Sequence, residues 1–158
     1  MIRTALFSSC GRFRYRLGRR WAEGPTVAFV LLNPSTADEL VDDPTVRRCI
    51  DFARRWGYAG LEVVNLYAYV ATDPGELRRA GYPVGPENDK HIRAAVRGCD
   101  PVVVAWGVHA GRLGRPAEVL QLLREAGVVP YCLRLTASGH PEHPLRLAKS
   151  CGLRPFGG

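Results

Sequence analysis

The chain has 158 residues, of which 46% are apolar and 23% are charged, a composition typical of a globular protein. Its 22 Lys and Arg residues outnumber its 15 Asp and Glu residues, which gives a formal charge of +7. No apolar run is long enough to span a membrane, and the five cysteines form no C-x-x-C pair of the kind that holds zinc or an iron–sulfur cluster. We therefore expect a single domain over residues 1–158 that is cytoplasmic and monomeric, with reduced cysteines, no metal and no cofactor.

The apolar pattern predicts short strands that alternate with helices. Residues 3–7 and 12–17 are expected to form a hairpin, and the continuous apolar run at 27–32 is typical of a strand buried on both faces. The elements expected after it are a helix at 45–56, a strand at 61–66, short and long helices at 75–80 and 88–98, a strand at 101–106, a helix at 115–126, a strand at 130–135 and a short helix at 145–151. This alternation predicts a three-layer α/β/α domain with a central four-stranded, mainly parallel sheet and an additional N-terminal hairpin.

Polar and aromatic side chains follow the four long strands where each strand ends. In a parallel sheet these carboxyl ends meet at one edge, and ligands bind beyond that edge. We therefore expect a concave, polar and aromatic site that suits a planar ligand. The candidate residues are Asn33, Ser35, Thr36, Asn65, Tyr67, Trp106, His109 and His143.

These residues also have ordinary structural explanations. Asn33 could simply end its strand, because Asn side chains bond local backbone groups. Asn65 lies in an apolar strand and needs a polar partner, which either the core or a ligand could supply. His143 and His109 could be ordinary loop histidines, and Trp106 could be a core residue. The side-chain amide of an asparagine places a donor beside an acceptor, so it could also pair with the edge of a nucleobase.

The basic residues suggest a second kind of contact. If the segment that precedes the first buried strand is extended, the alternating arginines at 12, 14 and 16 share one face and could contact a phosphate backbone. A charged edge strand that resists aggregation explains the same pattern equally well. The two arginines that follow Pro44 could contact phosphate or pair with nearby carboxylates. The candidate phosphate contacts are Arg12, Arg14, Arg16, Arg47 and Arg48.

The sequence contains no P-loop, G-x-S-x-G or H-E-x-x-H signature. Displacement of a base from a sugar requires none of them. That reaction needs an oriented water, a group that stabilises the leaving base and a pocket that receives the base.

Several motifs together resemble the DUF1643 family over nearly the whole chain. They are Cys10-Gly11-x-Phe13-Arg14-Tyr15, Leu32-Asn33-Pro34-Ser35-Thr36-Ala37-Asp38, Asp43-Pro44-Thr45-x-Arg47-Arg48-Cys49, Val64-Asn65-Leu66-Tyr67-Ala68, Ala105-Trp106-Gly107 and Gly139-His140-Pro141-x-His143-Pro144-Leu145. The order of these motifs is similar to that in the uracil-DNA glycosylase superfamily. This second resemblance implies that Asn33 orients the attacking water, Asn65 reads the base and His143 stabilises the leaving base.

The chain departs from that superfamily at two motifs. Leu31 and Ser35 stand where the mismatch-specific branch has glycines that let the backbone approach a ligand closely. Leu145 stands where the superfamily has a serine. The resemblance therefore does not specify uracil, and it leaves a different base or a free nucleotide open.

We predict a hydrolase of the N-glycosylase type that acts on DNA, as in DNA repair, or on a nucleotide. In this hypothesis Tyr67 or Trp106 stacks on the base. The alternative is a non-catalytic nucleic-acid-binding protein with a glycosylase-like fold. A third hypothesis is a small-molecule hydrolase or transferase that uses Ser35, Asp38 and His143, which requires those side chains to lie within hydrogen-bonding reach.

Overall fold

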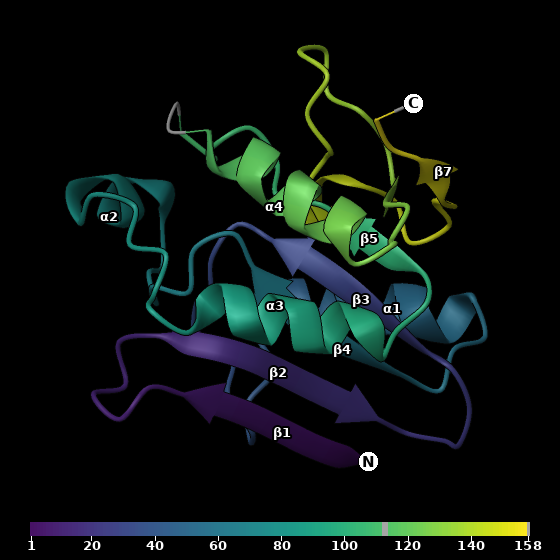
Figure 1. Ribbon diagram of the computed structural model, residues 1–158. Helices are drawn as coiled ribbons and strands as arrows, with labels where there is room; N and C mark the ends of the chain where they lie inside the picture. The colour runs from purple at the N-terminus through teal and green to yellow at the C-terminus, as the bar shows by residue number, and fades with distance from the viewer. Residues whose placement is uncertain (112–113, 158) are drawn as a thin grey trace.

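The computed structural model describes residues 1–111 and 114–157, which form one mixed sheet with helices on both faces (Figure 1). The strands are β1 (Ile2–Phe7), β2 (Arg14–Arg20), β3 (Thr26–Leu31), β4 (Gly60–Asn65), β5 (Val102–Val104), β6 (Tyr131–Cys132) and β7 (Arg154–Pro155). The helices are α1 (Pro44–Arg55), α2 (Pro74–Arg79), α3 (Asn88–Arg97) and α4 (Arg115–Glu125), followed by a 3-10 turn, η1 (Pro144–Arg146). No helix within the described residues is long and apolar enough to cross a membrane.

The sheet has the strand order β1-β2-β4-β3-β5-β6-β7. β3 pairs in parallel with β4 and with β5, and β5 pairs in parallel with β6. The α/β class is confirmed, but the expected four-stranded sheet with a separate hairpin is not what forms. The hairpin belongs to the sheet, because β2 continues to Arg20 and pairs antiparallel with β4. At the other edge, β7 adds an antiparallel strand beside β6.

The central strand β3 is buried on both faces, as its apolar run predicted. Alternate residues contribute to two separate cores: Val27, Phe29 and Leu31 pack with α1, whereas Ala28 and Val30 pack with α3 and α4. Figure 1 shows α3 and α4 in front of the strands and α1 behind them. Complete burial of a large apolar side chain contributes about 1.5–3 kcal/mol, so these two interfaces hold the three layers together.

The helix α1 begins where local sequence dictates. The Asp43 carboxylate accepts a hydrogen bond from the Val46 backbone N–H at 2.9 Å, and Pro44 occupies the first helical position. The helix ends just before Gly57, which has a φ of 84° that a residue with a side chain rarely adopts. These signals place α1 close to its expected range.

The helix expected at 145–151 is reduced to the single turn η1. A continuing α-helix needs the Pro144 carbonyl for the N–H four residues later. That carbonyl instead accepts from the Leu147 N–H and from Arg48 Nη1. The same Arg48 atom bonds the Leu147 carbonyl, so the chain is held in a non-helical path after one turn.

The loop between β3 and α1 is fastened to β2 by a buried arginine. The Arg19 side chain is 0% exposed, and its Nε donates to the Asp42 carboxylate at 2.8 Å. Its terminal nitrogens donate to the carbonyls of Gly18 at 2.8 Å and Val41 at 3.2 Å, and also to that of Asp38. A buried guanidinium needs such a complete set of acceptors. The loop therefore has a fixed path along the sheet.

Replacing Arg19 by Met should destabilise the protein by about 3–5 kcal/mol, because it leaves Asp42 and several loop carbonyls without their buried donor. Chemical denaturation followed by circular dichroism measures this loss. Arg20→Met is the matched control, since Arg20 only contacts exposed carbonyls. Equal losses for the two variants would show that Arg19 does not anchor the loop.

Candidate functional site

A cleft of about 760 Å³ opens beyond the carboxyl ends of β3 and β5. Four loops line it, after β3, β4, β5 and β6, and they contribute among others Asn33, Ser35, Asp73, Trp106, His109, Glu142 and His143. The loop after β3 leads to α1, whereas the loop after β5 leads to α4 on the opposite face of the sheet. The two loops after β3 and β5 therefore diverge, which is the place where open α/β sheets bind ligands.

Asn33 has a fixed orientation in this cleft. Its Nδ2 donates to the carbonyl oxygens of Pro34 at 2.8 Å and Ala71 at 2.9 Å. Because both neighbours are acceptors, the nitrogen must face them, and the side-chain oxygen remains as the free polar atom. Asn33 therefore offers the cleft an acceptor, to which a water molecule can donate.

His143 enters the cleft from the loop that precedes η1. Its Nδ1 accepts a hydrogen bond from the Leu145 backbone N–H at 3.2 Å. Burial is the main cause that lowers the pKa of His143 below its ordinary value of 6.5, although the neighbouring Glu142 opposes the shift. The ring is therefore neutral at pH 7. With Nδ1 as an acceptor, the proton resides on Nε2, which is a donor.

Three other predicted residues line the same cleft: Ser35, Trp106 and His109. Trp106 also belongs to the core beneath the cleft, where its ring meets Phe156 edge-to-face. Thr36 is exposed and does not line the cleft. Five of the eight residues predicted from the strand ends therefore line one cleft.

The other two predicted residues, Tyr67 and Asn65, are buried in the core. The Tyr67 hydroxyl donates to the Ala110 carbonyl at 2.6 Å, so it supports the loop after β5 from below. Asn65 is 1% exposed, and neither its amide nitrogen nor its amide oxygen has a hydrogen-bond partner among the described residues. A buried amide without partners is costly. Asn65 is therefore a buried polar group at the end of β4 that does not line the cleft.

Asp38 does not line the cleft that contains Ser35 and His143. Asp38 accepts hydrogen bonds from the backbone N–H groups of Leu40 and Val41, both at 2.8 Å, and these bonds lower its pKa. The histidine nitrogen that a carboxylate would orient is already occupied by the backbone. The geometry therefore disfavours nucleophilic catalysis by Ser35.

The predicted arginine stripe does not exist, because Arg14 and Arg16 face opposite sides of the sheet. An irregular register between β1 and β2, at Leu6 and Phe7, interrupts the alternation of side chains. Arg14 is 2% exposed and donates to the Ala37 carbonyl at 3.0 Å on the α1 side. Arg16 lies on the α3 side.

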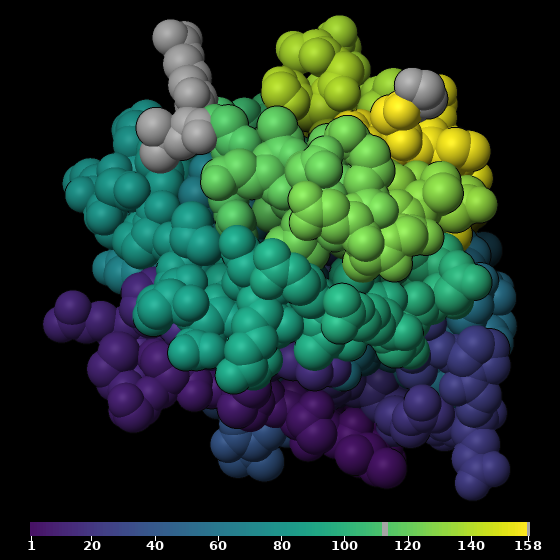
Figure 2. Space-filling model, viewed as in Figure 1, coloured from purple at the N-terminus to yellow at the C-terminus, as the bar shows by residue number. Residues whose placement is uncertain are grey.

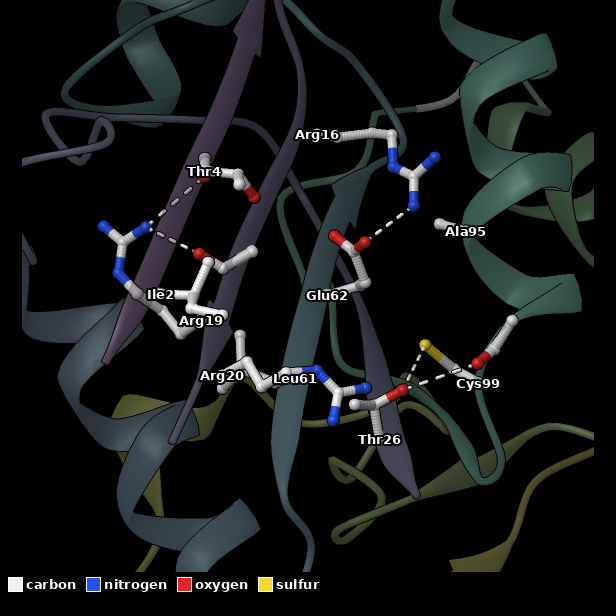
Figure 3. Close-up of a pocket in the computed structure, with 12 residues that line it drawn as sticks. Ile2, Thr4, Arg16, Arg19, Arg20, Thr26, Leu61, Glu62, Ala95 and Cys99 are labelled. Atoms are coloured by element: carbon white, nitrogen blue, oxygen red, sulfur yellow. Dashed lines mark hydrogen bonds and ion pairs between the residues drawn. The ribbon is translucent and has the colours of Figure 1, made fainter. Parts of the chain in front are cut away.

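Most of the other candidate arginines have protein partners. Arg16 pairs with Glu62 at 2.6 Å, and both line a hollow over β1, β2 and β4 that lies away from the cleft (Figure 3). Arg47 donates to the Asp42 carbonyl at 2.6 Å, and Arg48 to the carbonyls of Pro144 and Leu147. Among the five candidate arginines, Arg12 alone is exposed and has no such bond to a described residue. These arginines chiefly hold loops in place.

Some cleft residues were missed by the sequence analysis, notably Asp73, Glu142 and Arg146. Asp73 was interpreted only as part of a turn, and it does cap α2 by accepting from the Glu76 N–H at 2.9 Å. Its position after β4 is the signal that could have identified it. Within residues 1–111 and 114–157, no group of three His, Cys, Asp or Glu side chains is placed to hold a metal ion.

The lowered pKa of His143 makes a prediction about acid stability. Below pH 6.5 the unfolded chain binds a proton on this histidine more readily than the folded protein does, so stability falls as the pH drops towards the folded pKa. His143→Asn keeps an acceptor for the Leu145 N–H but cannot titrate. Urea unfolding at pH 7.5 and pH 5 measures the free energy of unfolding. Between these two pH values it should fall more in the wild type than in His143→Asn. An equal fall in both proteins would contradict the lowered pKa of His143 in the folded state.

The family model of DUF1643, described as a protein of unknown function, matches residues 14–145. No curated protein and no solved structure matches the chain. The matched segment begins at the start of β2 and ends within η1, so it includes Asn33 and His143 and the four loops around the cleft. The chain belongs to the DUF1643 family.

Proposed function

We propose that this protein hydrolyses the N-glycosidic bond between a nucleobase and a sugar, in DNA or in a nucleotide. The observation that carries the proposal is the pairing, in one cleft, of a fixed acceptor on Asn33 with a neutral imidazole donor on His143. Hydrolysis of this bond needs both groups: one orients the water, and the other stabilises the negative charge on the leaving base.

In this mechanism a water molecule donates a hydrogen bond to the side-chain oxygen of Asn33 and attacks the anomeric carbon of the sugar. The bond between that carbon and the base nitrogen breaks, and its electron pair moves onto the base. His143 Nε2–H donates a hydrogen bond to a carbonyl oxygen of the base, where the charge accumulates. The water gives up one proton to solvent, and the departing base takes up one.

The arrangement of the strands supports a glycosylase-like fold. The run β4-β3-β5-β6 is parallel throughout. Asn33 follows β3, Asn65 ends β4, and His143 follows β6, in the order that the resemblance to uracil-DNA glycosylases implies. The amide of Asn65 places a donor beside an acceptor, as a base edge requires, but it is buried and does not line the cleft, so the proposal rests on Asn33 and His143.

Asn33→Ala and His143→Ala should each reduce base release at least about a hundredfold while the fold is retained. The assay is mass spectrometry of free bases after incubation with oligonucleotides, nucleosides and nucleotides that carry uracil, hypoxanthine, xanthine and modified bases. His91→Ala is the control, because His91 stacks on Tyr15 away from the cleft. Circular dichroism and thermal unfolding establish that the variants are folded.

Two outcomes would contradict the proposal. One is the absence of base release from every substrate in the panel. The other is release that persists unchanged in Asn33→Ala and His143→Ala. A protein that binds oligonucleotides with a steep dependence on salt but releases no base would instead favour a binding role.

A further inference from the structure

A second cavity, of about 670 Å³, adjoins the cleft and shares with it the wall formed by Pro74, Val108 and His109. Its other sides come from α2, from the start of α4 and from the loop that carries His140. Figure 2 shows the teal segment with α2 beside the green start of α4, and in Figure 1 the loop around His140 projects above the sheet. Cavities of this size, placed side by side, can accommodate two parts of one ligand.

The ionisable side chains that line this second cavity differ from those that line the cleft. Arg78, His109 and His140 line it, and no Asp or Glu is among the described residues around it. The cleft, in contrast, includes Asp73 and Glu142 beside its histidines. Arg78 is therefore a cation at the wall of the second cavity that suits an anion, whereas the cleft has carboxylates as well as Arg146.

The Arg78 guanidinium is available to a ligand. Two of the buried arginines are held by carboxylates, Arg19 by Asp42 and Arg115 by Asp89. Arg78 is exposed on α2 and has no ion pair with any described residue. An arginine without a protein partner at the wall of a cavity is a suitable donor to two oxygens of a phosphate.

We propose that the second cavity binds the phosphate group of a nucleoside phosphate whose base occupies the cleft. This rests on the proposed function for the base and adds the class of substrate, a free nucleotide. Most arginines expected to follow a nucleic-acid backbone are engaged by the protein itself, so a single phosphate next to the cleft fits the surface better than a long strand.

The test is binding, which needs no turnover. Isothermal titration calorimetry at pH 7.5 compares the four deoxynucleoside 5′-monophosphates with the corresponding nucleosides, and inorganic phosphate serves as a competitor. The monophosphates should bind at least about tenfold more tightly than the nucleosides. Arg78→Gln and His140→Gln should each remove most of this difference. Arg79→Gln is the matched control, since it removes the same charge from the next residue of α2, which does not line the cavity.

Three results would overturn the proposal. The first is equal binding of nucleotides and nucleosides by the wild type. The second is an equal loss of nucleotide affinity in Arg78→Gln and Arg79→Gln, which would show that the positive charge of α2 attracts the nucleotide without a contact at the cavity. The third is affinity that rises with the length of a single-stranded oligonucleotide and falls steeply with salt, because a strand would then be the ligand. Failure of base release, with nucleotide binding that depends on Arg78, would reject the hydrolytic function and leave this site intact.

Discussion

The central position of β3 determines where this protein can bind a ligand. The connection that leaves β3 passes through α1 on one face of the sheet, whereas the connection that leaves β5 passes through α4 on the opposite face. The loops that leave the carboxyl ends of β3 and β5 cannot pack over each other, and a cleft remains between them. Side chains of β3 pack into a core on each face of the sheet below this edge. The cleft is thus a consequence of topology, and only its lining depends on particular residues.

Buried arginines in β2 hold the lining of the cleft in place. Arg19 and Arg14 bind carbonyls of the loop that connects β3 to α1, the same loop that carries Asn33 and supplies the Asp43 cap. Burial lowers the pKa of Arg14 to about 10, and the nearby Asp43 carboxylate limits that shift, so the side chain stays charged at neutral pH. A charged group in such a place is stable only while its acceptors stay in position, which couples the path of the loop to the edge of the sheet.

Residues whose environment is decided by near neighbours could be predicted from the sequence. The apolar run of β3 and the Asp43-Pro44 start of α1 are examples, because burial on both faces and capping leave local patterns. The prediction that the arginines at 12, 14 and 16 share one face was wrong. It assumed that side chains alternate regularly along the strand, and the irregular register opposite Arg14 breaks that alternation. The helix expected after Pro144 was lost to Arg48, a residue 96 positions earlier in the chain. The burial of Asn65 likewise depends on segments far from it in sequence.

The tautomer of His143 decides between two kinds of chemistry in the cleft. A histidine that activates a serine needs a free lone pair on the nitrogen that faces the nucleophile. Here the lone pair of Nδ1 is used by the Leu145 N–H, and protonation of the ring would break that bond, so the neutral ring carries its proton on Nε2. Such a ring can stabilise an anion but cannot accept a proton at Nε2. In the hydrolysis that we propose, the backbone thus leaves His143 with a donor for a leaving group that departs with negative charge, as a nucleobase does.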